Sequence, residues 1–379
     1  MPDAPPLAGL KVVEFARVLA GPWAGQILAD LGADVVKVES PSGDDTRGWG
    51  PPFIENADGT RDAAYFHATN RGKRSVVLDL ASAAGKARAA ELAAGADVVI
   101  ENFKLGGMAK FGLDYASLAA INPRLVYCSV TGFGQDGPYA PRAGYDFIVQ
   151  GLSGVMDLTG EPDGQPQKIG VAFADIMTGL YATIAIQAAL AERERSGMGQ
   201  HIDMALLDVM TGVLANQAMN YLVSGNAPKR MGNAHPNIVP YAVFPAVDGW
   251  LIIASGNDGQ FARLCEVIAI DPLPTWSTNA GRLADRAALT AALEAATATW
   301  QRDDLLAALE LRGIPAGPIN SVEQAFADPQ VRHRKLELEM IRPDGQTIPG
   351  VRLPIRFSRS PLADTLPSPL LGEMDTQGA

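Results

Sequence analysis

The sequence predicts an α/β protein, with a Rossmann-like, doubly wound large domain joined to a smaller α+β domain. Over roughly residues 8–200, short apolar runs typical of buried strands alternate with helical patterns. That alternation favours a parallel sheet with helices on both of its faces. After Asp208 the pattern changes to a hairpin followed by several helices, which indicates a second, smaller unit.

The large domain begins with a βαβ unit. Its two strands are expected at residues 10–15 and 33–39, on either side of a helical pattern over residues 21–31. The pattern that follows predicts strands at 74–80, 96–101 and 125–130, and helices at 83–94 and 115–121. We assign residues 1–205 to this domain.

A linker helix is expected over residues 206–225, and residues 226–322 form the predicted small domain. Two apolar runs there predict a β-hairpin, because Asp248-Gly249 between them suits a type I′ turn. Helical patterns follow at 260–268, 286–298 and 302–312. The tail, residues 323–379, is interrupted by prolines and predicts an extended return arm that completes the large domain.

Composition argues against several classes of protein. With 31 basic and 42 acidic residues, the net charge of -11 disfavours non-specific nucleic-acid binding and docking on an anionic membrane. The two cysteines, Cys128 and Cys265, are too few for a disulfide framework or a zinc cluster. We expect Cys128 to be a buried thiol within a strand. The four histidines are scattered along the chain, so we expect no metal site.

The N-terminus lacks the basic and apolar regions of a signal peptide. The longest apolar stretch, residues 176–190, is shorter than the ~20 residues that a membrane span needs. We therefore expect a soluble, cytoplasmic protein.

One motif invites a cofactor assignment that its surroundings do not support. Residues 132–137 match the G-x-G-x-x-G pattern of dinucleotide-binding proteins directly after a predicted strand. A dinucleotide site needs a helix to begin there, whereas Pro138 and Pro141 predict a loop. The sequence also contains no P-loop, no G-x-S-x-G and no H-E-x-x-H motif, so neither a simple serine hydrolase nor a metal-dependent hydrolase is supported.

Seven motifs follow one another along the chain: Arg17-Val-Leu-Ala-Gly-Pro22, Gly32-Ala-Asp-Val-Val-Lys-Val-Glu39, Asn70-Arg-Gly-Lys-Arg-Ser75, Glu101-Asn-Phe103, Gly144-Tyr-Asp146, Ala174-Asp-Ile-Met-Thr-Gly179 and Gly199-Gln-His-Ile-Asp203. In this order they resemble the landmarks of class III CoA transferases, the formyl-CoA transferase-like or CaiB/BaiF family. The similarity runs from residue 8 to about residue 372. The loop over residues 230–241 most resembles the succinyl-CoA:glutarate branch of the family.

The resemblance implies that Asp175 is the nucleophile. From the residues alone, Asp175 precedes a helical pattern and also fits a plain N-cap. The two interpretations are compatible, because a helix N-terminus favours an ionised carboxylate. In the implied reaction, CoA moves through aspartyl-anhydride and aspartyl-CoA intermediates. We expect no cofactor, because the CoA thioester is itself a substrate.

The resemblance also implies a CoA site. The positions that match family contacts to CoA are Leu19, Ala20, Leu78, Asn102, Phe103 and Lys110, with Arg142, Tyr145 and Asp146 in a loop beside the pantetheine arm. Lys73 and Arg74 are expected to add positive charge near the phosphates. Ser40 stands where some relatives carry an arginine, and Arg47 is the expected substitute.

Arg230, Asn233 and His235 form a polar cluster suited to binding a second, non-reacting carboxylate. We therefore expect succinyl-CoA as donor and a short dicarboxylate such as glutarate as acceptor. Two alternatives stay open. One is a 2-methylacyl-CoA racemase of the same fold, in which Tyr145 would stand where racemases carry a histidine base; a phenol with a pKa near 10 is a poor second base. The other is an acyl-CoA-binding protein without catalysis.

The family fold implies an interlocked, ring-through-ring homodimer. The expected partners are therefore a second copy of the chain, an acyl-CoA and a carboxylic acid, with no nucleic acid and no membrane.

Overall fold

The computed structural model describes residues 4–376, and the chain forms two compact units. The large unit comprises the chain up to Val155, residues 168–225 and the chain from Pro329 onward. The small unit comprises residues 156–167 and 226–328. The chain therefore enters the small unit twice, and the sequence analysis did not anticipate that residues 156–167 belong to it.

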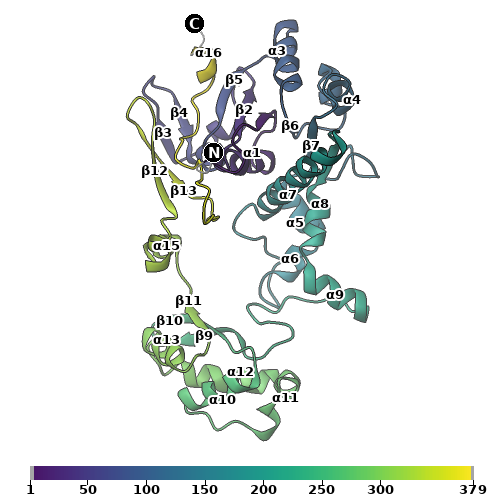
Figure 1. Ribbon diagram of the computed structural model, residues 1–379. Helices are drawn as coiled ribbons and strands as arrows, with labels where there is room; N and C mark the ends of the chain where they lie inside the picture. Colours follow the sequence, from purple (N-terminus) through teal and green to yellow (C-terminus); the bar gives the residue numbers. More distant parts are fainter. Residues whose placement is uncertain (1–3, 377–379) are drawn as a thin grey trace. The chain divides into compact units, whose positions relative to one another are not determined.

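A six-stranded parallel sheet forms the centre of the large unit (Figure 1). Its strands are β1 (Lys11–Glu14), β2 (Asp34–Glu39), β5 (Arg74–Val77), β6 (Val98–Glu101), β7 (Val126–Thr131) and β8 (His201–Ala205). They lie in the order β5-β2-β1-β6-β7-β8, and every neighbouring pair is parallel. The predicted parallel sheet is confirmed. The strand order reverses between β1 and β6, and in open α/β sheets ligands bind beside the carboxyl ends of the strands at such a point.

Helices cover both faces of this sheet because successive residues of each strand point to opposite sides. On one face, α1 (Ala20–Asp30) and α7 (Phe173–Ser196) pack with Val12, Ile100 and Cys128 in a common core. On the other, α3 (Ala83–Ala94) and α4 (Tyr115–Ala119) lie over a second core that includes Val13 and Val99. Cys128 is a fully buried thiol, as predicted.

Among the described residues, α7 is long and apolar enough, by length and composition, to cross a membrane. However, its residues Ala174, Ala182 and Ile186 belong to the core of the large unit. A Cβ atom on Gly179 would lie 2.7 Å from the carbonyl oxygen of Ala20. Glycine is therefore needed where α7 crosses α1, and we interpret α7 as a core helix.

The other elements of the large unit connect the strands or follow the small unit. The predicted linker helix is in fact two helices, α8 (Leu206–Gly212) and α9 (Ala215–Ser224). The remaining elements up to residue 225 are η1 (Asp45–Gly48), β3 (Phe53–Glu55), β4 (Arg61–Ala63), α2 (Ala64–Thr69), η2 (Met108–Phe111) and α5 (Asp146–Leu152); α6 (Val155–Leu158) lies where the chain passes between the units.

The tail contains α15 (Pro329–His333), a hairpin of β12 (Glu337–Ile341) and β13 (Thr347–Val351), and α16 (Glu373–Thr376). Between the hairpin and α16 it runs without regular structure and then packs against β5, the edge strand of the sheet. The backbone N–H of Gly372 donates to the Ser75 hydroxyl (3.0 Å), and that of Val77 donates to the Asp375 carboxylate (3.1 Å). The tail thus supplies hydrogen-bond partners along the sheet edge.

The small unit is a three-stranded antiparallel sheet packed on helices. Its elements are β9 (Tyr241–Ala246), β10 (Gly249–Ala254), α10 (Asp258–Val267), η3 (Pro274–Ser277), α11 (Asn279–Ala284), α12 (Arg286–Thr297), α13 (Arg302–Leu311), β11 (Ala316–Pro318) and α14 (Val322–Ala327). The predicted hairpin is present, but its connection is Val247-Asp248, one residue earlier than predicted, because Gly249 already pairs with Ala246.

Candidate active site

The loops that follow the strands bring most of the predicted site residues to the carboxyl edge of the large sheet. Leu19 and Ala20 begin α1 after β1, Leu78 follows β5, and Asn102 and Phe103 follow β6. Asp175 belongs to the same edge, because α7 begins there and returns the chain to the start of β8.

Asn102 joins the loop after β6 to the loop after β1 by hydrogen bonds, and β1 and β6 are the neighbouring strands between which the strand order reverses. Its side-chain oxygen accepts from the backbone N–H of Arg17 (2.9 Å), and its amide group donates to the Arg17 carbonyl (2.7 Å). The next residue, Val18, has a φ of 71°, which is strained for a β-branched side chain. Such strain persists only where the surroundings hold it, so the loop before α1 has a fixed shape at the expected CoA site.

The glycines that mimic a dinucleotide motif have a different role. The segment after β7 is a loop, as predicted, and no helix begins there. A Cβ atom on Gly132 would lie 2.5 Å from the Cα of Gly144, and one on Gly144 would lie 2.4 Å from the Cα of Gly132. The two backbones touch, and this closed loop delivers Tyr145 and Asp146 to the beginning of α5.

Asp175 lies in the first turn of α7 and is not its N-cap, which corrects one prediction. The helix begins at Phe173, and the carboxylate of Asp146 acts as the cap. One Asp146 oxygen accepts from the backbone N–H of Ala174 (2.7 Å) and of Asp175 (3.3 Å). Asp146 therefore binds the backbone of the expected nucleophile, whereas the sequence analysis had assigned it to CoA.

The surroundings of Asp175 favour its protonated form. Burial and the nearby Asp146 carboxylate raise the pKa of Asp175 to about 7. The helix N-terminus had suggested a readily ionised group, but desolvation and the second carboxylate have a larger effect on the pKa of Asp175 than the helix N-terminus has.

Tyr65 of α2 interacts electrostatically with both carboxylates. Burial, together with Asp175 and Asp146, raises the pKa of Tyr65 to about 12. Tyr65 is thus a neutral hydroxyl beside the site, and no sequence motif pointed to it.

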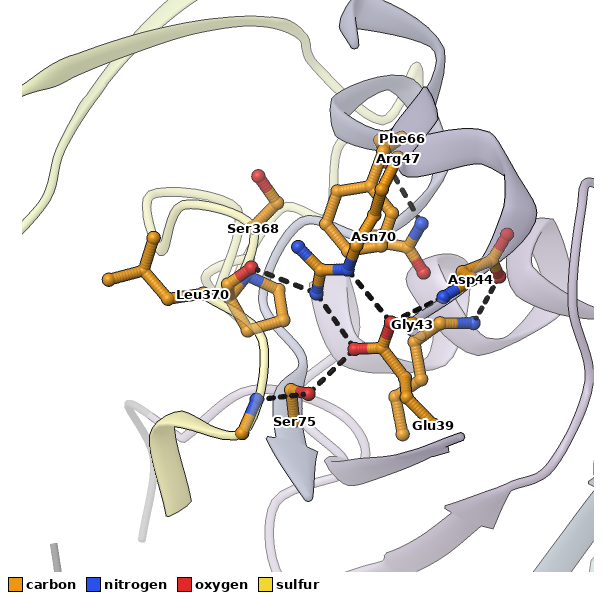
Figure 2. Close-up of polar contacts among 12 residues, drawn as sticks. Glu39, Gly43, Asp44, Arg47, Phe66, Asn70, Ser75, Ser368 and Leu370 are labelled. Carbon is orange, nitrogen blue, oxygen red and sulfur yellow. Dashed lines mark hydrogen bonds and ion pairs between the residues drawn. The ribbon is translucent and has the colours of Figure 1, made fainter. Parts of the chain in front are cut away.

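Arg47 does not have the role predicted for it. Its guanidinium is buried, lies over the Phe66 ring, and donates to both oxygens of Glu39 (2.8 and 2.7 Å) and to the Pro369 carbonyl of the tail (3.4 Å) (Figure 2). It also donates to Asp62 (3.0 Å). These partners occupy four of its five N–H groups. Arg47 joins the β2 end to the tail, and this corrects its assignment as the substitute for the arginine that some relatives carry at position 40.

Lys73 is likewise buried. Its ammonium donates to Glu14 (2.9 Å), the Pro22 carbonyl (2.8 Å) and Asn70 (2.9 Å), which uses all three of its N–H bonds. Burial lowers the pKa of Lys73 to about 8, against the attraction of Glu14. Lys37, also buried, contacts the same Glu14 (3.1 Å) and Asp44 (2.9 Å). The cluster holds β1, β2 and the start of α1 together, and Lys73 has no N–H left for a phosphate.

Arg74 begins β5 and therefore lies at the opposite, amino edge of the sheet, where it pairs with both oxygens of Asp34, the first residue of β2 (2.6 Å each). This corrects its expected place near the CoA phosphates, because ligands of such sheets bind beside the carboxyl ends of the strands. Two exposed basic residues at the carboxyl edge keep their expected role as candidates. Lys110 is exposed in η2, and the exposed Arg142 lies over the Tyr139 ring at 3.8 Å. Tyr145 is 64% exposed at the start of α5.

A cavity of about 340 Å³ opens beside the ends of β6 and β7. Its lining includes Phe103 from the expected CoA site, together with Glu101, Lys104, Ser129 and His201. The Ser129 hydroxyl and Nε2 of His201 are 2.9 Å apart, and the imidazole stacks on the Tyr115 ring at 5.3 Å. Burial raises the pKa of Glu101. Sequence reasoning did not bring these three polar side chains together, because they come from three different strands.

The three residues expected to bind the acid lie in one loop of the small unit. Arg230 donates to the carboxylate of Asp157 (2.9 Å) and to the carbonyl of Glu161 (3.3 Å), and so connects the two parts of this unit. His235 packs against Tyr241 with ring centres 5.2 Å apart, and its Nδ1 accepts from Asn237 N–H (3.1 Å). Asn233 is exposed. Their role toward a substrate stays a prediction.

Comparisons with a family model, with known proteins and with solved structures all indicate the same family. A family model described as CoA-transferase family III matches residues 7–375. The chain is 60% identical to the succinate–glutarate CoA-transferase of Agrobacterium fabrum, over 98% of this chain and 94% of that protein. It is 41% identical to the succinyl-CoA:glutarate CoA-transferase of Mus musculus, over 97% of this chain and 84% of that protein. The crystal structure of a CaiB/BaiF family protein from Brucella suis matches with a TM-score of 0.89 and 62% identity, over 99% of this chain and 98% of that chain.

Proposed function

The chain belongs to CoA-transferase family III, and from this membership we propose that it transfers CoA from succinyl-CoA to glutarate with Asp175 as nucleophile. The observation that carries the proposal is the 60% identity, over almost the whole chain, to a succinate–glutarate CoA-transferase. The position of Asp175 in the first turn of α7, at the carboxyl edge of the sheet, supports its assigned role.

In the proposed reaction, the ionised carboxylate of Asp175 attacks the thioester carbonyl of succinyl-CoA. The C–S bond breaks, CoA leaves as thiolate, and a mixed anhydride remains on Asp175. The thiolate then attacks the aspartyl carbonyl, which releases succinate and leaves an aspartyl-CoA thioester. Glutarate reverses these two steps: its carboxylate displaces the thiolate, which then takes the glutaryl group and restores Asp175. Each step exchanges acyl groups of comparable activation, so no further energy source is required.

The environment of Asp175 suits both halves of this cycle. A pKa of about 7 leaves a large fraction of the carboxylate ionised at neutral pH, ready to attack. The same burial that raises this pKa favours the uncharged acyl forms of Asp175 that the intermediates require. Asp146 fixes the backbone at the nucleophile, and the neutral Tyr65 hydroxyl is available as a hydrogen-bond donor nearby.

A trapping experiment tests the assignment. During turnover with succinyl-CoA, hydroxylamine should convert Asp175 into a hydroxamate that peptide mass spectrometry locates. Asp175→Ala should abolish both the label and transfer to glutarate while leaving the fold intact. Asp208→Ala is the matched control, because Asp208 is an exposed aspartate in the first turn of α8. Transfer at the wild-type rate by Asp175→Ala would end the proposal.

The proposed enzyme is a cytoplasmic, interlocked homodimer. The family resemblance implies this assembly, and exposed apolar side chains on the large unit support it: Phe147, Ile148 and Leu152 on α5, and Leu180, Tyr181 and Ile184 on α7. Apolar side chains gathered in this way usually mark a protein interface, and we assign a second copy of the chain as the partner. Light scattering should give twice the 39.9 kDa mass of the chain, and a monomer at micromolar concentration would contradict the assignment.

A further inference from the structure

Gln150 is fully buried in α5, one helical turn after Asp146. Residues spaced by four lie on the same face of a helix, so the two side chains meet. The Gln150 amide group donates to one carboxylate oxygen of Asp146 (2.8 Å), and its carbonyl oxygen accepts from the backbone N–H of Ile169 (2.9 Å). A carboxylate can only accept and a backbone N–H can only donate, so these two partners fix the orientation of the amide.

These contacts form a continuous path to the expected nucleophile. Ile169 lies in the segment that leads into α7, and the other oxygen of Asp146 binds the backbone N–H groups of Ala174 and Asp175. Gln150 thus connects α5 to the approach of α7 and holds the carboxylate that caps α7. It is fully buried, and within residues 4–376 its side-chain hydrogen bonds go to Asp146 and Ile169 and not to Asp175.

We propose that Gln150 is a positioning residue for the transfer reaction: it aims the Asp146 carboxylate at the first turn of α7 and thereby orients Asp175. The inference rests on the proposed function, in which Asp175 attacks the thioester. Attack requires the carboxylate to be held close to one geometry, and small displacements of a reacting group cost large factors in rate. A buried amide with two fixed partners provides that constraint without touching the substrate.

Two substitutions at Gln150 test this role. Gln150→Leu removes the donor to Asp146 and so frees the carboxylate whose charge acts on the pKa of Asp175. Gln150→Glu keeps an acceptor for Ile169 but adds a negative charge beside Asp146, which raises the pKa of Asp175. The groups found to act electrostatically at Asp175 are Asp146 from α5 and the Tyr65 phenol from α2, and neither substitution alters the phenol.

The kinetic test compares the pH dependence of kcat/KM for both variants with that of the wild type. We expect kcat at the pH optimum to fall roughly tenfold to a hundredfold in each, with KM for succinyl-CoA little changed. The acid limb should move in Gln150→Leu, which frees the Asp146 carboxylate, and it should move to higher pH in Gln150→Glu.

Gln26→Leu is the matched control. Gln26 is a buried glutamine of α1 that also bridges two segments: it donates to the Ala68 carbonyl (3.1 Å) and accepts from the Arg71 N–H (2.8 Å). It should lose stability as Gln150→Leu does, yet keep the wild-type pH profile. Loss of rate in both Gln150 variants with an unmoved acid limb would reduce Gln150 to a structural residue and overturn the inference.

A second readout does not depend on activity. Carbon-13 NMR of aspartate-labelled protein, with Asp175→Asn to assign the resonance, reports the titration of Asp175 directly. A shifted titration of Asp175 in both Gln150 variants would support the inference even if the wild type transferred no CoA, an outcome that would overturn only the proposed function. An unchanged titration in both variants would overturn the inference while an active wild type left the transferase proposal standing.

Discussion

The Asp175→Asn substitution keeps the shape of the side chain and removes its charge, and we expect it to stabilise the protein at alkaline pH. The pKa of Asp175 is raised from 3.8 to about 7, so the folded state favours the protonated carboxyl. Stability from this group is complete below the unfolded pKa and is lost as the pH rises through about 7. A difference of about 3 units at ~1.36 kcal/mol each makes the ionised carboxylate cost about 4 kcal/mol at pH 8.

Asp175→Asn should therefore raise the free energy of unfolding at pH 8 by about 4 kcal/mol while it abolishes transfer. At pH 5 the gain should fall to less than half, because only about one unit separates that pH from the unfolded pKa. Reversible urea denaturation of both proteins at the two pH values measures the difference. An equal gain at pH 5 and pH 8, or a destabilised variant at pH 8, would refute the reasoning.

Three further outcomes are expected. Glu14→Gln removes the carboxylate that Lys37 and Lys73 share and leaves two buried ammonium groups without full charge compensation. The free energy of unfolding, measured by urea denaturation, should fall by roughly 3–5 kcal/mol. An unfolding midpoint equal to that of the wild type would contradict the described cluster. If Arg230 and His235 bind the distal carboxylate, glutarate should exceed valerate roughly tenfold to a hundredfold in kcat/KM, and equal use of the two acids would remove the dicarboxylate assignment. Transfer should survive EDTA in purified protein, whereas strict dependence on an added metal ion would point to another mechanism.

Local sequence patterns predicted β1, β2, β5, β6 and β7 of the large sheet, because these strands are short apolar runs whose burial leaves a clear signal. They did not predict β8, an edge strand in which exposed and half-buried residues alternate. They also predicted that residues 132–137 form a loop, since Pro138 and Pro141 prevent a helix there. The true reason for the glycines, the contact between the backbones of Gly132 and Gly144, depends on a partner twelve residues away and has no local signature.

The errors at the site share one physical cause. Arg47 and Lys73 were expected in the CoA site, because a basic residue carries no local sign of burial. Their carboxylate partners come from β1 and β2, and only the folded sheet brings Glu14 and Glu39 to them. In the same way, Asp175 was interpreted as an N-cap because the real cap, Asp146, lies 29 positions earlier. Tyr65 and Gln150 act through distant neighbours as well, so no motif contained them.

The dependence of β5 on the tail has a consequence for biosynthesis. Ser75 and Gly372, which hydrogen-bond in the finished protein, are 297 positions apart. At translation rates of roughly 5–20 residues per second, that separation takes about 15–60 s to synthesise. Throughout this interval the edge strand β5 lacks the tail residues that pack against it in the folded protein, and the Arg47 guanidinium lacks the Pro369 carbonyl as an acceptor. The segment that covers β5 therefore emerges long after the strand itself, and a chain truncated before residue 366 should aggregate or require chaperones.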